Sequence, residues 1–407
     1  MLLNYFKIAI AVLRRRKFFT FISLFGISFT LTIMLVLTAF ITSLVGNKYP
    51  DKKRDRLLYI RNMELTGPQS MNSSNVSFYM LDHYVRSMAT PVQIAIATPY
   101  KGTNTYLNNR KIEVNYKYTN ADYWQVLDYD FLEGKPYTAQ QVAAGERVTV
   151  ISEYMKKAYF GNTPLVTGQY IEADNVKYRI SGVVKSIPIT NYLLYSDIYL
   201  PYTVSKTDYT GKGYLGNYTG ILLANSKAAV PKIQQEYEAI IARLPLPSKE
   251  YDHLYSHALP YMQAYVATGD EKRSGMNRVL LAISIFTLLV MLLPTLNLVN
   301  INVTRILERS SEIGVRKAFG ASSSTLVQQF IIENLLLTLL GGVIGVVLSA
   351  IILYSFNHAH LVANLHLVLN FTVLGIGLLI CLVFGLLSGV YPAWRMSRMH
   401  VVTALKA

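Results

Sequence analysis

Residues 18–45 read FFTFISLFGISFTLTIMLVLTAFITSLV and contain no charged side chain. Because an α-helix rises 1.5 Å per residue, this stretch would span roughly 42 Å, against a hydrocarbon core of about 30 Å. We therefore expect a membrane-spanning helix that projects past the bilayer. The preceding basic run, residues 14–17, also suits a signal peptide. The apolar run is too long for one, and no small-x-small cleavage site follows, so the stretch should remain as an anchor.

Three further apolar blocks, residues 279–303, 326–356 and about 371–390, predict three more spans. A charge at mid-bilayer costs about 2.5–3.5 kcal/mol, and these blocks nearly exclude charge. Glu333 is the exception, and we expect it near the cytoplasmic interface, paired with a basic or amide neighbour in a structural role. The expected fold is a membrane protein with four transmembrane α-helices and a large α+β extracytoplasmic domain between the first and the second.

The expected division of the chain follows from these blocks. It comprises an amphipathic cytoplasmic or interfacial segment (1–17), the first transmembrane helix (18–46), the extracytoplasmic α+β domain with its stalk ends (47–276), the second helix (277–303), a cytoplasmic connecting helix (304–324), the third helix (325–356), a short outer loop (357–369), the fourth helix (370–393) and a cytoplasmic tail (394–407).

The basic residues set the expected orientation. The formal net charge is +15, of which residues 47–276 carry only +5, so the excess lies beside the apolar blocks. This pattern indicates membrane topology rather than nucleic-acid binding, with both termini in the cytoplasm. A cluster of basic residues after the first span opposes this orientation: Lys48, Lys52, Lys53, Arg54 and Arg56. This cluster begins a very long loop, however, and such loops translocate largely regardless of charge.

The extracytoplasmic stretch mixes strand-like and helix-like patterns. Residues 147–151, 176–184 and 197–200 resemble strands. Ser152 is a plausible N-cap for a helix over 153–160 that Gly161 would end, and residues 232–244 predict an amphipathic helix. Cys381 is the single cysteine and lies in an apolar block, so this domain must be stabilised by its own core. The many tyrosines of this domain have two equally favoured interpretations: they form a contact surface for a partner, or they pack half-buried within the domain.

Motifs of nucleotide and metal chemistry are weak or missing. Residues 211–216 match G-x-G-x-x-G, but a strand-like stretch follows where a phosphate site needs a helix, so we interpret them as a loop. The sequence contains no P-loop, no H-E-x-x-H and no G-x-S-x-G. His358, His360 and His366 fit polar interfacial residues better than a metal site. We therefore expect no catalytic residue, no metal and no cofactor bound by this chain.

Small residues recur at four-residue spacing in the last two apolar blocks, which allows close helix approach in lipid. The neighbouring helix could belong to this chain or to another protomer. The candidate set for this contact is Gly341, Gly345, Ser349, Gly385, Gly389 and Pro392.

The connector over residues 305–324 is the most informative stretch. Glu308 with Glu312 and Glu312 with Arg316 are spaced i,i+4, and the second pair is a favourable ion pair. Gly320 can end this helix, and one of the serines over Ser322–Ser324 can cap the next one. Two interpretations of this short, charged, capped helix are equally compatible with the sequence. It is either a docking site for a cytoplasmic partner or an inert surface helix.

This segment resembles the MacB/FtsX-like family of ABC transporter permeases. The resemblance covers 13–20, 26–27, 297–300, 308–321, 329–333, 341–342, 384–393 and 404–405, with weaker matches at 150–153, 160–161 and 180–184. The family usually has a proline in the C-terminal motif where this chain has Val401.

The resemblance implies a mechanism termed mechanotransmission. A separate ATPase, present in two copies and carrying ATP and Mg²⁺, would drive two permease copies, either identical chains or close paralogues. The resemblance also implies two further partners, a periplasmic adaptor protein and membrane lipid. It places the chain in the bacterial inner membrane. Motion would pass along the second helix and its extension, roughly residues 259–278, to the outer domain. The residues implied in coupling to the ATPase are Glu308, Arg309, Glu312, Ile313, Gly314, Arg316, Lys317, Ala318 and Gly320.

Three outputs are compatible with this resemblance. Efflux or extrusion of a substrate is favoured by the long outer domain. A non-transporting transducer that activates cell-wall hydrolases usually carries a smaller one. Lipoprotein extraction toward an outer membrane is the third.

Overall fold

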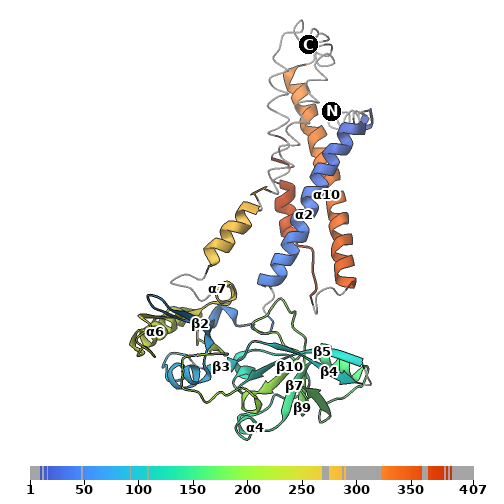
Figure 1. Cartoon of the computed structure of the whole chain (residues 1–407). Helices are drawn as coiled ribbons and strands as arrows, with labels where there is room; N and C mark the ends of the chain where they lie inside the picture. Colours follow the sequence, from blue (N-terminus) through green and yellow to red (C-terminus); the bar gives the residue numbers. More distant parts are fainter. Residues whose placement is uncertain are drawn as a thin grey trace. The chain divides into compact units, whose positions relative to one another are not determined.

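The computed structural model describes residues 10–11, 13–15, 17–46, 49–91, 93–107, 110–267, 275–286, 288–289, 315, 319, 322–359, 365–379, 382–383 and 386 (Figure 1). The chain divides into two compact units. The helical unit comprises Met1–Ser43, Leu281–Leu361 and His366–Ala407, and the α+β unit comprises Leu44–Leu280 and Val362–Leu365.

Two long helices dominate the described part of the helical unit, α2 (Lys17–Gly46) and α10 (Ser323–His358). Within them, Thr20–Ser43 and Ile331–His358 are long and apolar enough to cross a membrane. They match the expected first and third spans. Of the expected second and fourth spans the structure describes Met276–Phe286 and residues 371–379 as helical, and most of the rest lies outside the described residues.

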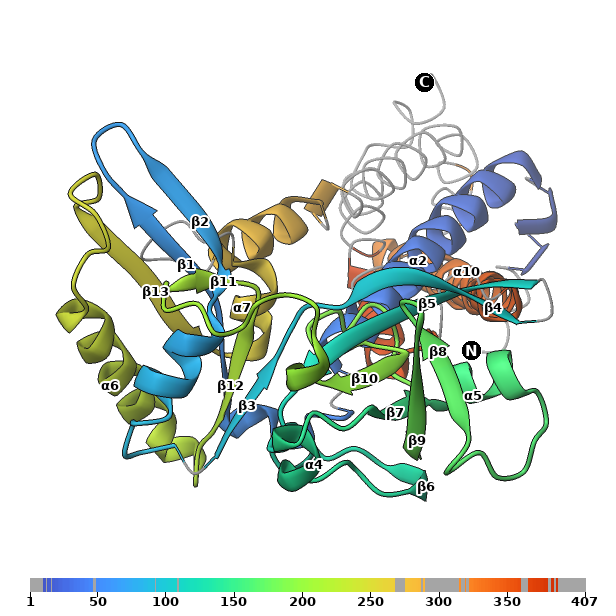
Figure 2. The same ribbon diagram turned by 60° about the horizontal axis from the view of Figure 1, so that its bottom comes forward.

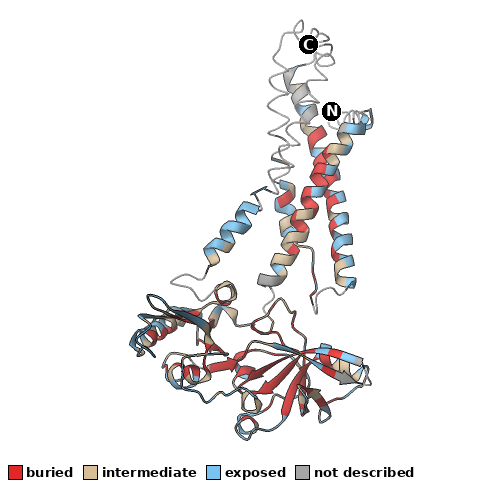
Figure 3. Cartoon of the chain, viewed as in Figure 1, coloured by how far each residue is buried: buried red, intermediate tan, exposed pale blue. Residues whose placement is uncertain are grey.

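The two long helices each have a buried side and an apolar exposed side, as the colouring by burial shows (Figure 3). Ile27, Leu31 and Leu337 form the buried cluster. Phe21, Phe25 and Phe29 lie exposed along α2, and their rings stack in sequence. Exposed phenyl rings on a helix without charges are typical of a surface solvated by lipid.

The α+β unit is built on one 13-stranded mixed sheet (Figure 2). The strand order is β11-β2-β1-β12-β3-β5-β10-β7-β9-β6, with β13 paired to β1, β4 to β5 and β8 to β9. The strands are β1 (Leu57–Thr66), β2 (Met71–Val76), β3 (Gln93–Ala97), β4 (Lys101–Leu107), β5 (Arg110–Thr119), β6 (Phe131–Gly134), β7 (Val148–Ser152), β8 (Tyr170–Ala173), β9 (Val176–Val184), β10 (Ile198–Pro201), β11 (Leu215–Gly216), β12 (Thr219–Leu223) and β13 (His253–Leu259).

The sheet divides into two lobes. The first lobe holds β1–β3 and β11–β13 with helix α6 (Val230–Arg243) and the π-helix η2 (Met80–Val85) over its core. The second lobe holds β4–β10 with α4 (Ala139–Ala143) and α5 (Glu153–Phe160). The lobes share a third, aromatic core cluster that includes Tyr59 of β1 in the first lobe and Tyr199 of β10 in the second.

Short helices occupy the connections between these strands. They are α3 (Tyr123–Val126), α7 (Tyr261–Val266), and the 3-10 turns η1 (Arg54–Arg56), η3 (Tyr202–Val204) and η4 (Lys227–Ala229).

Local sequence signals place several of these elements correctly. Ser152 caps α5, its side chain accepting from the Met155 N–H, and Gly161 ends that helix with φ +62°, a conformation that favours glycine. The expected helix over 232–244 corresponds to α6.

The extension of the second helix, expected over roughly residues 259–278, is interrupted in the structure: residues 261–266 are helical, whereas residues 259, 260 and 267 are not. Leu259 ends strand β13, Pro260 follows, and Tyr261 begins the separate helix α7, after which Ala267 is extended. The physical reason is Pro260, because the residue before a proline is disfavoured in the α region and proline donates no backbone hydrogen bond.

Candidate functional site

The predicted docking segment lies mostly outside the described residues. This holds for Glu308, Arg309, Glu312, Ile313, Gly314, Arg316, Lys317, Ala318 and Gly320. Two neighbours on the same segment are described. Val315 and Phe319 are joined by a backbone hydrogen bond of 3.1 Å, and the Phe319 ring is 88% exposed. Ser322 then caps α10 by accepting from the Thr325 N–H at 3.2 Å, which confirms the predicted cap.

The small residues of α10 lie against α2 of the same chain. A Cβ added to Gly341 would lie 2.7 Å from Ile27 Cγ2, and one added to Gly345 would lie 3.1 Å from the Ser28 carbonyl oxygen. Ser349 is fully buried and donates to the Gly345 carbonyl at 2.7 Å. The partner that the sequence left open is therefore an intrachain helix at these positions. Gly385, Gly389 and Pro392 lie outside the described residues.

Gly345→Leu should destabilise the helical unit by about 1–3 kcal/mol, because a larger side chain must displace backbone rather than a flexible side-chain end. Gly375→Leu is the matched control, since a Cβ there meets nothing within 4 Å. Thermal unfolding of the detergent-solubilised chain measures both. Equal midpoints for the two variants would contradict a role of Gly345 in helix contact.

Glu333 of α10 is fully buried in the protein, and its position near the cytoplasmic interface stays a prediction. Its side chain takes part in at least one polar or electrostatic interaction. A buried carboxylate in an apolar helix must have such compensation, so a structural role fits it.

In the α+β unit, Arg54 forms a buried ion pair within the first segment and contacts an aromatic ring of the last. The Arg54 guanidinium donates to both oxygens of Asp51 at 2.7 and 2.9 Å, and Tyr59 donates a third hydrogen bond at 3.2 Å. Burial raises the pKa of Tyr59 well above its ordinary value, so this hydroxyl stays protonated. Arg54 also lies 4.1 Å from the ring centroid of Tyr261, the first residue of α7. We name these four residues the clamp.

The basic cluster that opposed the predicted orientation has partners within this unit. Lys52 pairs with Asp130 at 2.7 Å, Lys53 with Asp128 at 2.9 Å, and Arg56 donates to a backbone carbonyl. These charges therefore serve the folded unit, and no membrane surface is needed to explain them.

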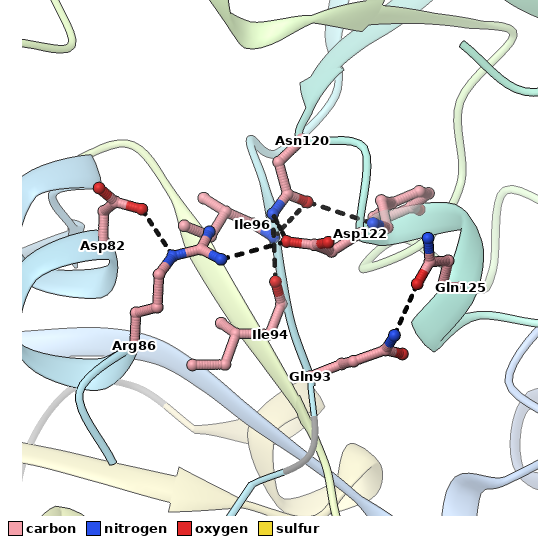
Figure 4. A network of polar contacts seen from close by, with 9 residues as sticks. Asp82, Arg86, Gln93, Ile94, Ile96, Asn120, Asp122 and Gln125 are labelled. Carbon is pink, nitrogen blue, oxygen red and sulfur yellow. Dashed lines mark hydrogen bonds and ion pairs between the residues drawn. The ribbon is translucent and has the colours of Figure 1, made fainter. Parts of the chain in front are cut away.

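The strand pairing at the joint between the two lobes is short and is extended by polar side chains, beside the aromatic core cluster that the lobes share. Strands β3 and β5 share one regular pair, Ala97 with Thr119. Beyond this pair, the side chain of buried Asn120 forms hydrogen bonds with the backbone of β3 (Figure 4). Its Oδ1 accepts from the Ile96 N–H at 3.0 Å, and its Nδ2 donates to the Ile94 carbonyl at 3.1 Å. One side chain thus holds the edge of the first lobe to the end of a strand in the second.

Charged groups extend this joint. Asp122 accepts from Asn120 at 3.1 Å and from Arg86 at 3.3 Å, and Arg86 also pairs with Asp82 of η2 at 2.8 Å (Figure 4). No sequence motif pointed to these residues. The only signal was an asparagine directly after a strand-like run, which is typical of any turn.

The second lobe contains a fully buried lysine. Lys117 of β5 donates to the Leu193 carbonyl at 2.9 Å, and burial lowers the pKa of its ammonium group to about 7. The sequence does not reveal this burial, because one lysine in an alternating strand is expected to face solvent.

The glycine-rich stretch over 211–216 ends in the short strand β11 and leads into strand β12. A helix N-terminus that could receive a phosphate is missing at this place in the described chain, so the interpretation as a loop is supported.

Two family models match the chain. Residues 20–240 match the MacB-like periplasmic core domain, and residues 284–401 match the FtsX-like permease C-terminal domain. The second match includes the predicted docking segment.

Curated relatives agree with these models. The chain is 27% identical over 315 residues to the macrolide export ATP-binding/permease protein MacB of Salmonella choleraesuis, covering 76% of this chain and 46% of the relative. It is 26% identical over 322 residues to the protein of the same name from Burkholderia pseudomallei, covering 78% and 47%. The chain thus spans about half the length of the curated relatives it matches.

Two solved structures are similar in part. They are the periplasmic region of MacB from Actinobacillus actinomycetemcomitans (16% identity, 52% of this chain, 94% of that chain, TM-score 0.36) and a domain of a putative permease from Porphyromonas gingivalis (14%, 51%, 91%, 0.39).

Proposed function

The chain belongs to the MacB/FtsX-like family of ABC transporter permeases, and on that premise we propose that it is the permease subunit of an exporter driven by a separate ATPase. It is a membrane protein with an extracytoplasmic domain. In the proposed complex, two ATPase copies bind ATP and Mg²⁺ and pull on two permease copies. The helical units pass this motion to the α+β units, which act on substrate outside the membrane with an adaptor protein.

The exposed Phe319 ring is the observation that carries the docking part of this proposal. It lies just before the capped start of α10, on the segment where the sequence places Glu308, Glu312 and Arg316. An exposed aromatic ring beside charged side chains is the usual composition of an anchor at a protein interface. The proposed orientation, with this segment and both termini in the cytoplasm, puts it within reach of a soluble ATPase.

Glu312→Lys and Phe319→Ser should each weaken association with the ATPase about tenfold or more, because one reverses an ion-pairing charge and the other removes an anchor ring. The measurement is co-purification of the ATPase with tagged permease from native membranes. Arg398→Ala, in the proposed cytoplasmic tail, is the control and should leave the yield unchanged. Full ATPase recovery with both connector variants would remove the docking role.

Efflux or extrusion is the favoured output over activation of cell-wall hydrolases and lipoprotein extraction. The α+β unit has two lobes, three core clusters and a 13-stranded sheet, which is a large structure for relaying a signal alone.

A further inference from the structure

A cavity of about 110 Å³ lies where the two lobes of the α+β unit meet. Thr98 follows strand β3 and Tyr218 precedes β12, both of the first lobe, whereas Lys101, Tyr116 and Tyr118 belong to strands β4 and β5 of the second. Its other lining residues are Pro99, Asp174, Ser205, Lys206, Thr207 and Asn217. A molecule bound here would therefore contact both lobes.

Three tyrosines give the cavity a neutral, hydrogen-bonding wall. Tyr116, Tyr118 and Tyr218 are buried. Burial raises the pKa of Tyr116 and of Tyr218 to about 12, and it also raises the pKa of Tyr118. These phenols are therefore protonated at neutral pH and can donate hydrogen bonds.

The charges of the wall favour an anion. Aromatic rings beside a carboxylate could also form a cage for an ammonium group. Here, however, the Lys206 ammonium group already forms an ion pair with the Asp174 carboxylate at 2.8 Å. It also donates a hydrogen bond to the Asp174 backbone carbonyl at 2.9 Å. Lys101 lines the same cavity, and among the described residues no carboxylate lies within ion-pair distance of it. The lining thus carries one uncompensated positive charge.

The volume limits the size of the ligand. Drug-sized molecules occupy pockets of about 300–1,000 Å³, so this cavity holds only a small molecule or the end of a longer one. We propose that the junction cavity binds a small carboxylate, supplied by a free organic acid or by the C-terminal end of a peptide. The Lys101 ammonium and the tyrosine hydroxyls would contact the carboxylate oxygens. The proposal is independent of transport, since it concerns binding to this chain alone.

Calorimetric titration of the detergent-solubilised full chain tests the chemistry. Benzoate represents a free acid, with benzamide as its neutral isostere and benzylamine as a cation. N-acetyl-Gly-Gly and its amide represent a peptide end. We expect each carboxylate to bind about tenfold or more tightly than its amide, because only the anion meets the positive charge. Binding of benzoate alone assigns the cavity to free acids, and binding of both carboxylates extends it to peptide ends.

Two variants place the binding in this cavity. Lys101→Met should weaken benzoate binding about tenfold, and Tyr118→Phe, which keeps the ring and loses one donor, about threefold to tenfold. Lys111→Met removes a lysine from the same hairpin outside the cavity and should change nothing. If Lys101→Met fails to fold, Tyr118→Phe decides the location. Equal binding of acids and amides, tighter binding of benzylamine, absence of carboxylate binding up to about 10 mM, or unchanged binding in both cavity variants would overturn the proposal.

Discussion

Replacing Arg54 with methionine should destabilise the α+β unit by about 3–5 kcal/mol, because the Asp51 carboxylate would remain fully buried without its counter-charge. The lost contact of the guanidinium with the Tyr261 ring adds to this cost. The measurement is chemical unfolding of the detergent-solubilised chain followed by Trp124 fluorescence. Since the chain has two tryptophans, a Trp394→Phe background leaves Trp124 as the single reporter.

Lys52→Met is the matched control for Arg54→Met. Lys52 pairs with Asp130 at the same 2.7 Å, but both side chains are about half exposed, and such pairs contribute about 0–1 kcal/mol. A loss in Arg54→Met no larger than that in Lys52→Met would show that the clamp does not hold the first and last segments of the unit together.

The parts of the fold that depend on short stretches could be predicted from the sequence. Helices α2 and α10 follow from long apolar runs, interrupted in α10 by Glu333, and the free energy of transfer of these runs to lipid outweighs any local preference. The caps at Ser152 and Ser322 follow from a side chain and an N–H only three residues apart.

The joint and the clamp could not be predicted, because they depend on contacts between distant residues. Asn120 meets Ile94 and Ile96 only after a hairpin has returned the chain, and Arg54 reaches Tyr261 across most of the α+β unit. A polar residue in a strand-rich sequence carries no sign of which strand it will meet. The break at Pro260 is different, because a proline in the sequence already indicates that a helix does not continue through it.

The clamp and the joint together connect the ends of the α+β unit and its two lobes. The clamp ties the segment that leads into the first strand to helix α7, near the end of the unit. The joint connects the first lobe to the second through one strand pair, the backbone hydrogen bonds on either side of it and the Asn120 side chain, beside the aromatic core cluster that both lobes share.

Lys117→Met should stabilise the α+β unit at pH 7 by about 1–4 kcal/mol, since a buried charge that meets a single carbonyl is replaced by an apolar chain of similar length. The gain also depends on pH. The pKa of Lys117 is about 7 in the folded chain and near 10.5 when unfolded, so between these values the unfolded chain binds more protons. The wild type should therefore gain stability as pH rises from 7 to 10, by up to about 3–5 kcal/mol, and the variant should lack this gain.

Lys111→Met is the control for Lys117→Met, because Lys111 lies on the same strand with its side chain about half exposed. It should leave both the stability at pH 7 and its dependence on pH close to those of the wild type. Trp124 fluorescence in the Trp394→Phe background again reports unfolding, at pH 6, 7, 8.5 and 10, roughly spanning the two pKa values. If Lys117→Met and the wild type changed in parallel with pH, the lysine would titrate with an ordinary pKa, and a solvent path to its ammonium group would have to exist.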